Sequence, residues 1–210
     1  MDVHIFIPCF IDQLYPNVGF SMIKILEKVG CKVIYNPNQT CCGQPAFNAG
    51  FRGEAKSVCT KFLDDFKEAN YIVSPSASCI GFIKNYMPEL YSNTSQLNRV
   101  QRLKENAYEL SDFLVNVLKV EDLGATFEHT ITYHDSCAQL RECGLKEEPR
   151  KLLRNVRGLE LREMNESETC CGFGGTFAVK FAPISTAMAD QKVANASATE
   201  AEYLVSTDMS

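Results

Sequence analysis

The cysteines of this sequence have types and spacings that could do chemistry. The chain has ten, and two vicinal pairs, Cys41-Cys42 and Cys170-Cys171, are each preceded by threonine and followed by glycine. A disulfide between neighbouring cysteines is strained, and adjacent side chains diverge too much to chelate one tetrahedral ion easily. In a cluster of several irons, each thiolate can bind a different metal atom. The pairs therefore indicate an iron–sulfur cluster, with burial of the cysteines as small hydrophobic residues as the simpler alternative.

The glycine after each pair fits the same interpretation. Gly43 and Gly172 have no Cβ, so the backbone at these positions can come close to a bulky ligand. We expect their N–H groups to point at cysteine sulfur.

A repeat relates three further cysteines to the two pairs. Cys9 and Cys137 each follow a short apolar segment and lie 32 and 33 positions before the first cysteine of a pair. Cys79 follows another apolar segment, residues 71–73, whose counterpart is residues 203–205. Matched spacing of this kind indicates a duplicated architecture. The alignment places the counterpart of Cys79 one position beyond the last residue, so we expect the chain to be a shortened form of a longer protein.

Strand and helix signals alternate along the chain, which favours parallel sheets covered by helices. The sequence predicts an α/β fold of two pseudo-repeated lobes, each a mainly parallel sheet flanked by helices. We expect the lobes to span residues 1–95 and 107–210, with the polar stretch 91–106 as the joint. Ser111 is predicted to be the N-cap of the helix that follows the joint.

In parallel sheets, ligands gather at the carboxyl ends of the strands, where several of these cysteines are expected. The candidate ligands form two sets: Cys9, Cys41, Cys42 and Cys79 in the first lobe, and Cys137, Cys170 and Cys171 in the second. Their spacing is wider than the C-x₂-C loops of zinc fingers and ferredoxins, so the fold must assemble each site. Zinc bound by four thiolates is the alternative to iron–sulfur.

Four other residues have roles that the sequence leaves open or assigns to packing. Cys31 and Cys59 are predicted to be structural. Cys143 could be a supplementary ligand or an oxidisable thiol. His134, three residues before Cys137, could donate a hydrogen bond to cluster sulfur, relay protons, or only satisfy the backbone at the end of a strand.

Composition narrows the function classes. The net charge of −5 and the pI near 5.3 argue against a dedicated nucleic-acid binder. The first eight residues lack the basic segment of a signal peptide, and no apolar run approaches the length of a transmembrane helix. We therefore expect a cytoplasmic protein, in which clustered cysteines serve metal or redox chemistry more often than disulfides.

Four segments carry a resemblance to a known family: Pro8-Cys9-Phe10, Thr40-Cys41-Cys42-Gly43-Gln44-Pro45, His134-Asp135-Ser136-Cys137 and Cys170-Cys171-Gly172-Phe173-Gly174-Gly175. The chain resembles the cysteine-rich (CCG) domain family, whose members include one of the heterodisulfide reductase subunits and the iron–sulfur subunits of glycolate oxidase. Over its whole length it is similar to the lactate-utilization members. The resemblance implies [4Fe-4S]-type clusters, one per lobe, ligated by both candidate sets. It further implies a bacterial complex that oxidises L-lactate to pyruvate, with a ferredoxin-like iron–sulfur subunit and a third small subunit as partners.

The sequence departs from the reductase pattern after Cys79. Ile80-Gly81-Phe82 follows, without the second cysteine of a Cys-x-x-Cys ending, which argues against disulfide-cleaving chemistry. A cluster-dependent thiol–disulfide reductase and a zinc-binding interaction module remain the alternative functions. Sequence alone identifies no lactate-binding residue, although Arg141 is a cation that could pair with the carboxylate.

Overall fold

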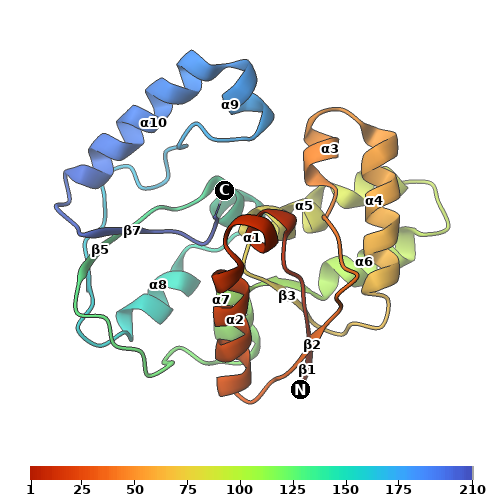
Figure 1. Ribbon diagram of the computed structural model, residues 1–210, viewed down its shortest axis with the longest axis horizontal. Helices are drawn as coiled ribbons and strands as arrows, with labels where there is room; N and C mark the ends of the chain where they lie inside the picture. The colour runs from red at the N-terminus through yellow and green to blue at the C-terminus, as the bar shows by residue number, and fades with distance from the viewer. Residues whose placement is uncertain (210) are drawn as a thin grey trace.

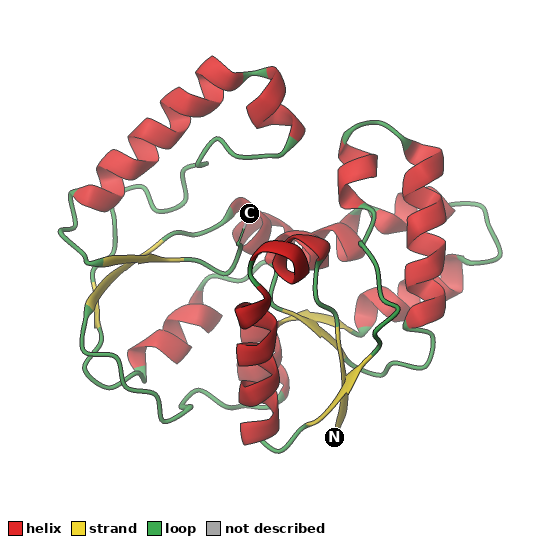
Figure 2. Ribbon diagram, viewed as in Figure 1, coloured by secondary structure: helices red, strands yellow, loops and turns green. Residues whose placement is uncertain are grey.

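The computed structural model describes residues 1–209, which form two lobes that lie side by side (Figures 1 and 2). Each lobe contains one parallel sheet, with strand order β2-β1-β3-β4 in the first and β6-β5-β7 in the second. The strands are β1 (Asp2–Ile5), β2 (Lys32–Tyr35), β3 (Ile72–Ser74), β4 (Ala107–Glu109), β5 (Thr130–Tyr133), β6 (Glu160–Leu161) and β7 (Tyr203–Val205). This arrangement confirms the predicted α/β class.

Helices connect the strands and cover the sheets. In the first lobe they are α1 (Cys9–Leu14), α2 (Pro16–Lys28), α3 (Gln44–Asn48), α4 (Arg52–Asp65), α5 (Ala77–Asn85), the 3₁₀ helix η1 (Met87–Tyr91) and α6 (Leu97–Glu105). Beyond β4 come α7 (Leu110–Asp112), the π-helices η2 (Phe113–Val117) and η3 (Ala138–Glu142), α8 (Glu147–Arg154), α9 (Thr176–Lys180) and α10 (Ala182–Ser197). Within residues 1–209, none of the helices has the length and apolar character that crossing a bilayer requires.

Strand register supports the repeat that the sequence predicts. The central strand of each sheet, β1 or β5, pairs on one side with the strand that precedes the vicinal cysteines and on the other with the last strand of the repeat. Ile5 pairs with Val73 in the first sheet, and Tyr133 pairs with Val205 in the second. These are equivalent positions in the sequence alignment, so these strand pairings match residue for residue in the two sheets.

The segment between the lobes is structured. Residues 97–105, within the stretch expected as a joint, form α6, and the following strand β4 pairs in parallel with β3. Residues 107–109, which we expected to begin the second lobe, are thus the fourth strand of the first sheet. The division into residues 1–95 and 107–210 stays a prediction.

The helix after β4 is capped differently from the prediction. The side chain of Glu109 accepts hydrogen bonds from the backbone N–H groups of Ser111 (2.8 Å) and Asp112 (3.3 Å), so Glu109 is the capping residue rather than Ser111. Burial raises the pKa of Glu109 to about 7, although these hydrogen bonds oppose the shift. A long acidic side chain at the end of a strand can fold back over the next helix, which a pattern of short capping residues does not reveal.

The first lobe holds most of the hydrophobic core. Phe6, Phe62 and Phe66 pack edge-on and tilted against one another between β1 and α4. The second lobe is less deeply packed: Lys192 is the one buried residue of α10, and that helix exposes Ile184 and Val193.

The lobes meet where α5 lies against η3. A Cβ on Gly81 of α5 would overlap the side chain of Glu142, so only glycine permits this close approach. The side-chain amide of Asn85 also donates to the Glu142 carbonyl at 2.8 Å. Because η3 begins directly after Cys137 and α5 contains Cys79, this contact sets the two cysteine-bearing elements against each other.

Candidate metal centre

The first cysteine set (Cys9, Cys41, Cys42 and Cys79) is brought together by the carboxyl end of the first sheet. Cys9 begins α1 after β1, the vicinal pair lies in the loop between β2 and α3, and Cys79 lies in the first turn of α5 after β3. The sulfurs of Cys42 and Cys79 are 3.5 Å apart. Cys41 shifts the pKa values of both Cys9 and Cys42, so these thiols also lie close to it.

The thiols of this set differ widely in pKa. The neighbouring Cys42 thiol, together with the N–H of Gly43 and against the effect of burial, lowers the pKa of Cys41 to about 6. Burial and the neighbouring Cys41 raise the pKa of Cys9 to about 11, and the pKa of Cys42 is raised well above its usual value by its bonds to Cys41 and Cys79. The set therefore holds one thiolate readily, at Cys41, and a bound cation would be needed to stabilise the others.

The glycines after the vicinal pairs have matching roles in the two lobes. Gly43 N–H points at the sulfur of Cys41, and Gly172 N–H points at that of Cys170, both at 3.4 Å. Both glycines have positive φ, +98° and +83°. A Cβ at Gly43 would lie 2.9 Å from Cys59 Sγ, and one at Gly172 would overlap the Ser185 carbonyl. The expected N–H···S bonds are present, and the close approach that demands glycine is to α4 and α10.

The second cysteine set (Cys137, Cys170 and Cys171) is more open. Cys137 is exposed at the start of η3, and the vicinal pair is half-buried in the loop between β6 and α9. Burial raises the pKa of Cys137, and the nearby Cys170 and Cys171 raise it further, which places the three side chains in one neighbourhood. The expected fourth position, beyond Ser210, lies outside the described residues.

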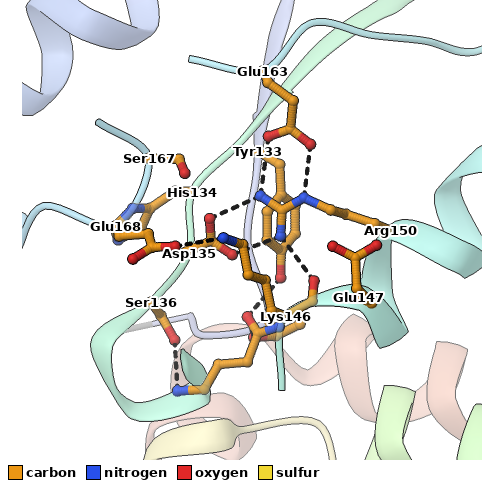
Figure 3. A network of polar contacts seen from close by, with 12 residues as sticks. Tyr133, His134, Asp135, Ser136, Lys146, Glu147, Arg150, Glu163, Ser167 and Glu168 are labelled. Carbon is orange, nitrogen blue, oxygen red and sulfur yellow. Dashed lines mark hydrogen bonds and ion pairs between the residues drawn. The ribbon is translucent and has the colours of Figure 1, made fainter. Parts of the chain in front are cut away.

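The loop before Cys137 is anchored by a buried ion pair (Figure 3). The guanidinium of Arg150 binds Asp135 through two bonds of 2.7 and 2.8 Å and Glu163 through two bonds of 2.7 and 3.0 Å. Burial alone would raise the pKa of Asp135, but hydrogen bonds from Arg150 and Ser167 outweigh it and the pKa is lowered. Asp135 therefore stays charged and fixes the backbone two residues before Cys137.

A second carboxylate ties the two cysteine-bearing loops together across the lobes. Asp208, which follows β7, accepts hydrogen bonds from the Ser76 and Ser78 hydroxyls, both at 3.0 Å, and from the Ser78 backbone N–H at 3.0 Å. The Ser136 hydroxyl donates to it at 3.3 Å. Asp208 thus contacts the residue next to Cys79 and the residue next to Cys137.

Three cations contact the loop that carries Cys170 and Cys171. Lys192 is buried and donates to the carbonyls of Glu166 and Ser167 at 2.9 and 3.0 Å. Lys146 pairs with the Glu168 carboxylate at 2.5 Å, and Arg141 reaches the Glu168 carbonyl at 3.5 Å. Sequence reasoning missed Lys192, Arg150 and Asp208 as supports of the site. Their residue types alone do not distinguish them from exposed charged residues.

The remaining three cysteines have surroundings different from those of the two sets. Cys31 is buried among the apolar residues of β1 and α2, as predicted. Cys59 is fully buried and donates to the Cys42 carbonyl at 3.3 Å, so it supports the first set from behind. Cys143 contacts the Ala77 carbonyl at 3.5 Å, and burial raises its pKa to about 12. Its predicted roles, ligand or oxidisable thiol, stay predictions.

His134 lies beside the second set with an unused nitrogen. Its Nδ1 is buried and has no hydrogen-bond partner among the described residues. Burial and the nearby Lys192 lower its pKa, which favours the neutral imidazole. This leaves a donor or acceptor available on the imidazole, and the proposed bond to sulfur and the proton relay stay predictions.

The donor chemistry fits a thiolate-bound metal group. Among residues 1–209, no three or more His, Cys, Asp or Glu side chains surround a single position for one metal ion. The first set is instead a group of neighbouring thiols, all of them soft donors, which suits iron–sulfur clusters or other thiophilic metals. In an iron–sulfur site, Cys9, Cys41, Cys42 and Cys79 would hold one group and Cys137, Cys170 and Cys171 would contribute to another.

Comparisons with known proteins agree with the duplicated architecture. A family model described as a cysteine-rich domain, CCG, matches residues 3–84 and again residues 131–210. The chain is 46% identical over 209 residues to "Lactate utilization protein A" of Bacillus velezensis, covering 99% of this chain and 87% of that protein. It is 44% identical over 208 residues to the protein of the same name from Bacillus licheniformis and over 210 residues to the one from Oceanobacillus iheyensis. The coverage is 99% and 87% for the first, and 100% and 86% for the second.

Proposed function

Because this chain belongs to the family of proteins with cysteine-rich CCG domains, we propose that it is an iron–sulfur subunit of a complex that oxidises L-lactate to pyruvate. The observation that carries this proposal is the convergence of Cys9, Cys41, Cys42 and Cys79 at one sheet edge, together with a second, pseudo-equivalent set. The similarity to proteins named for lactate utilization supports the substrate.

An iron–sulfur subunit would carry the electrons of this oxidation one at a time. Conversion of L-lactate to pyruvate releases two electrons and two protons, and an iron–sulfur group of the [4Fe-4S] type would supply one-electron transfer. The residues of this chain would hold that group and set its surroundings. The N–H groups of Gly43 and Gly172 donate to cysteine sulfur, and the buried Lys192 places a positive charge beside the second set.

We also propose the setting in which this subunit works. Its partners would be a ferredoxin-like iron–sulfur subunit and a third small subunit, which would accept or deliver the electrons. Cysteines that serve as metal ligands must stay reduced, which the cytoplasm maintains, so we propose a cytoplasmic location. The apolar side chains that α10 exposes, including Ile184 and Val193, support contact with another protein.

One observation weighs against the reductase alternative. Phe82, at the position of the second cysteine in a Cys-x-x-Cys ending, is fully buried and its ring packs against that of Phe47 at 5.3 Å. The core, rather than an additional ligand, occupies this site. Turnover of disulfide substrates by the purified protein would nevertheless revive that alternative.

The test is metal analysis of protein purified without oxygen. We expect iron and acid-labile sulfide in equal amounts, and each of Cys42→Ser and Cys171→Ser should remove about half of both if each lobe binds one cluster. Cys31→Ala is the matched control, because this cysteine is buried but belongs to neither set. Zinc without sulfide would refute the redox function and favour a zinc-binding interaction module.

A further inference from the structure

An open hollow lies directly beside the second cysteine set. Its volume is about 600 Å³, and Arg141, Met164, Ser167, Thr169 and Cys170 are among the residues that line it. Arg141 projects from η3, the π-helix that begins after Cys137, and Cys170 belongs to the loop between β6 and α9. The hollow therefore borders both segments that carry the second set, and π-helices of this length are frequent at functional sites.

The guanidinium of Arg141 is available in this hollow. It is exposed, forms no ion pair among residues 1–209, and its one hydrogen bond is a long contact of 3.5 Å to the Glu168 carbonyl. The two carboxylates that line the hollow are engaged elsewhere. Lys146 binds Glu168 at 2.5 Å, and the Thr169 hydroxyl donates to Glu166 at 3.0 Å.

Basic side chains offset the two carboxylates that line the hollow. Lys146 pairs with Glu168, and the buried Lys192 donates to the Glu166 carbonyl, so Arg141 is the lining cation without a charged partner among the described residues. A guanidinium presents a planar fork that matches a carboxylate in two parallel hydrogen bonds. The buried Met164 offers an apolar wall.

We propose that this hollow binds a small 2-hydroxycarboxylate, with the Arg141 guanidinium as the partner of its carboxylate. The inference rests on the proposed function and adds to it the position and chemical class of the substrate site. A carboxylate bound there would place the hydroxyl-bearing carbon next to the second cysteine set, while the methyl group of a three-carbon acid would face Met164.

The test is binding of L-lactate to the full chain, purified without oxygen and followed by ligand-observed NMR. Arg141→Gln should weaken binding by about tenfold or more, the loss expected for one charge-assisted pair. Arg141→Lys keeps the charge but lacks the planar fork of the guanidinium, so its affinity for L-lactate should lie between those of the unaltered protein and Arg141→Gln. Arg157→Gln is the matched control: this arginine is also exposed, lies in the same lobe and lines no part of the hollow. Propane-1,2-diol, which lacks the carboxylate, should not bind.

Two results would overturn the inference: binding to Arg141→Gln within twofold of the unaltered protein, or no L-lactate binding by the unaltered protein. Iron and sulfide content, measured on the same samples, reports separately on the proposed function. If the protein contains iron but does not bind L-lactate, the proposed substrate site alone is refuted. A protein without iron that still binds L-lactate through Arg141 refutes the electron-transfer function and retains the site.

Discussion

The two carboxylates that bind the Arg150 guanidinium should contribute very different amounts to the free energy of unfolding. The same guanidinium binds Asp135 and Glu163 with bonds of similar length, but the Asp135 side chain is 0% exposed and that of Glu163 is 45% exposed. Asp135→Asn leaves a buried guanidinium short of its charged partner and should cost about 3–5 kcal/mol. Glu163→Gln removes a bond that water can replace and should cost about 1 kcal/mol or less.

The assay is urea unfolding of the metal-free full chain at pH 7, followed by far-UV circular dichroism because the chain has no tryptophan. When Arg150→Met is already present, Asp135→Asn should lower the free energy of unfolding by less than about 1 kcal/mol further, since no buried cation is left that needs the carboxylate. Equal costs for Asp135→Asn and Glu163→Gln would refute the assignment of Asp135 as the buried anchor. Because the pKa of Asp135 is lowered, its contribution is present above its ordinary pKa and should fade as the pH falls through the lowered value.

Three further predictions concern Glu109, Gly172 and Asp208. Because the pKa of Glu109 is raised, the free energy of unfolding should fall by about 3 kcal/mol as the pH rises from its ordinary pKa of 4.5 to its folded value of about 7. Glu109→Gln should flatten this pH dependence in unfolding curves, and an unchanged dependence would contradict the assignment. Gly172→Ala should lower the free energy of unfolding by at least about 1 kcal/mol more than Gly30→Ala does. Both glycines have positive φ, but only at Gly172 would the added Cβ meet another backbone segment. Equal urea midpoints for the two variants would contradict this. Asp208→Ala should accelerate hydrogen exchange at the Ser78 amide by about tenfold or more, and unchanged protection would show that the inter-lobe bond is not made in solution.

The sequence was sufficient for the features that depend on periodic pattern and on repetition. The parallel sheets and the residue-level equivalence of the halves follow from apolar strand segments that recur with matched spacing. The approach of Cys42 to Cys79 follows because parallel strands end at one edge. The assignment of all seven candidate cysteines as metal ligands stays a prediction.

The features that sequence reasoning did not reach depend on long-range contacts of single side chains. Ser111 has the residue type of an N-cap, but the longer Glu109 side chain reaches the same N–H groups. The segment of residues 107–109 is polar at its end and short, so only its pairing with β3 shows that it extends the first sheet. Arg150 and Lys192 have the residue types of exposed helix positions, and their burial becomes apparent only when their carboxylate and carbonyl partners are placed.

The bond between Ser76 and Asp208 has a consequence for the history of the duplication. These residues occupy equivalent positions in the two halves, so the bond joins one position of the repeat to its own counterpart. Identical residues at the two positions could not form it, because two aspartates repel and two serines lack the charged acceptor. The halves have since become complementary at this point. A dimer rebuilt from two copies of either half would therefore lose the bond that holds the lobes together here.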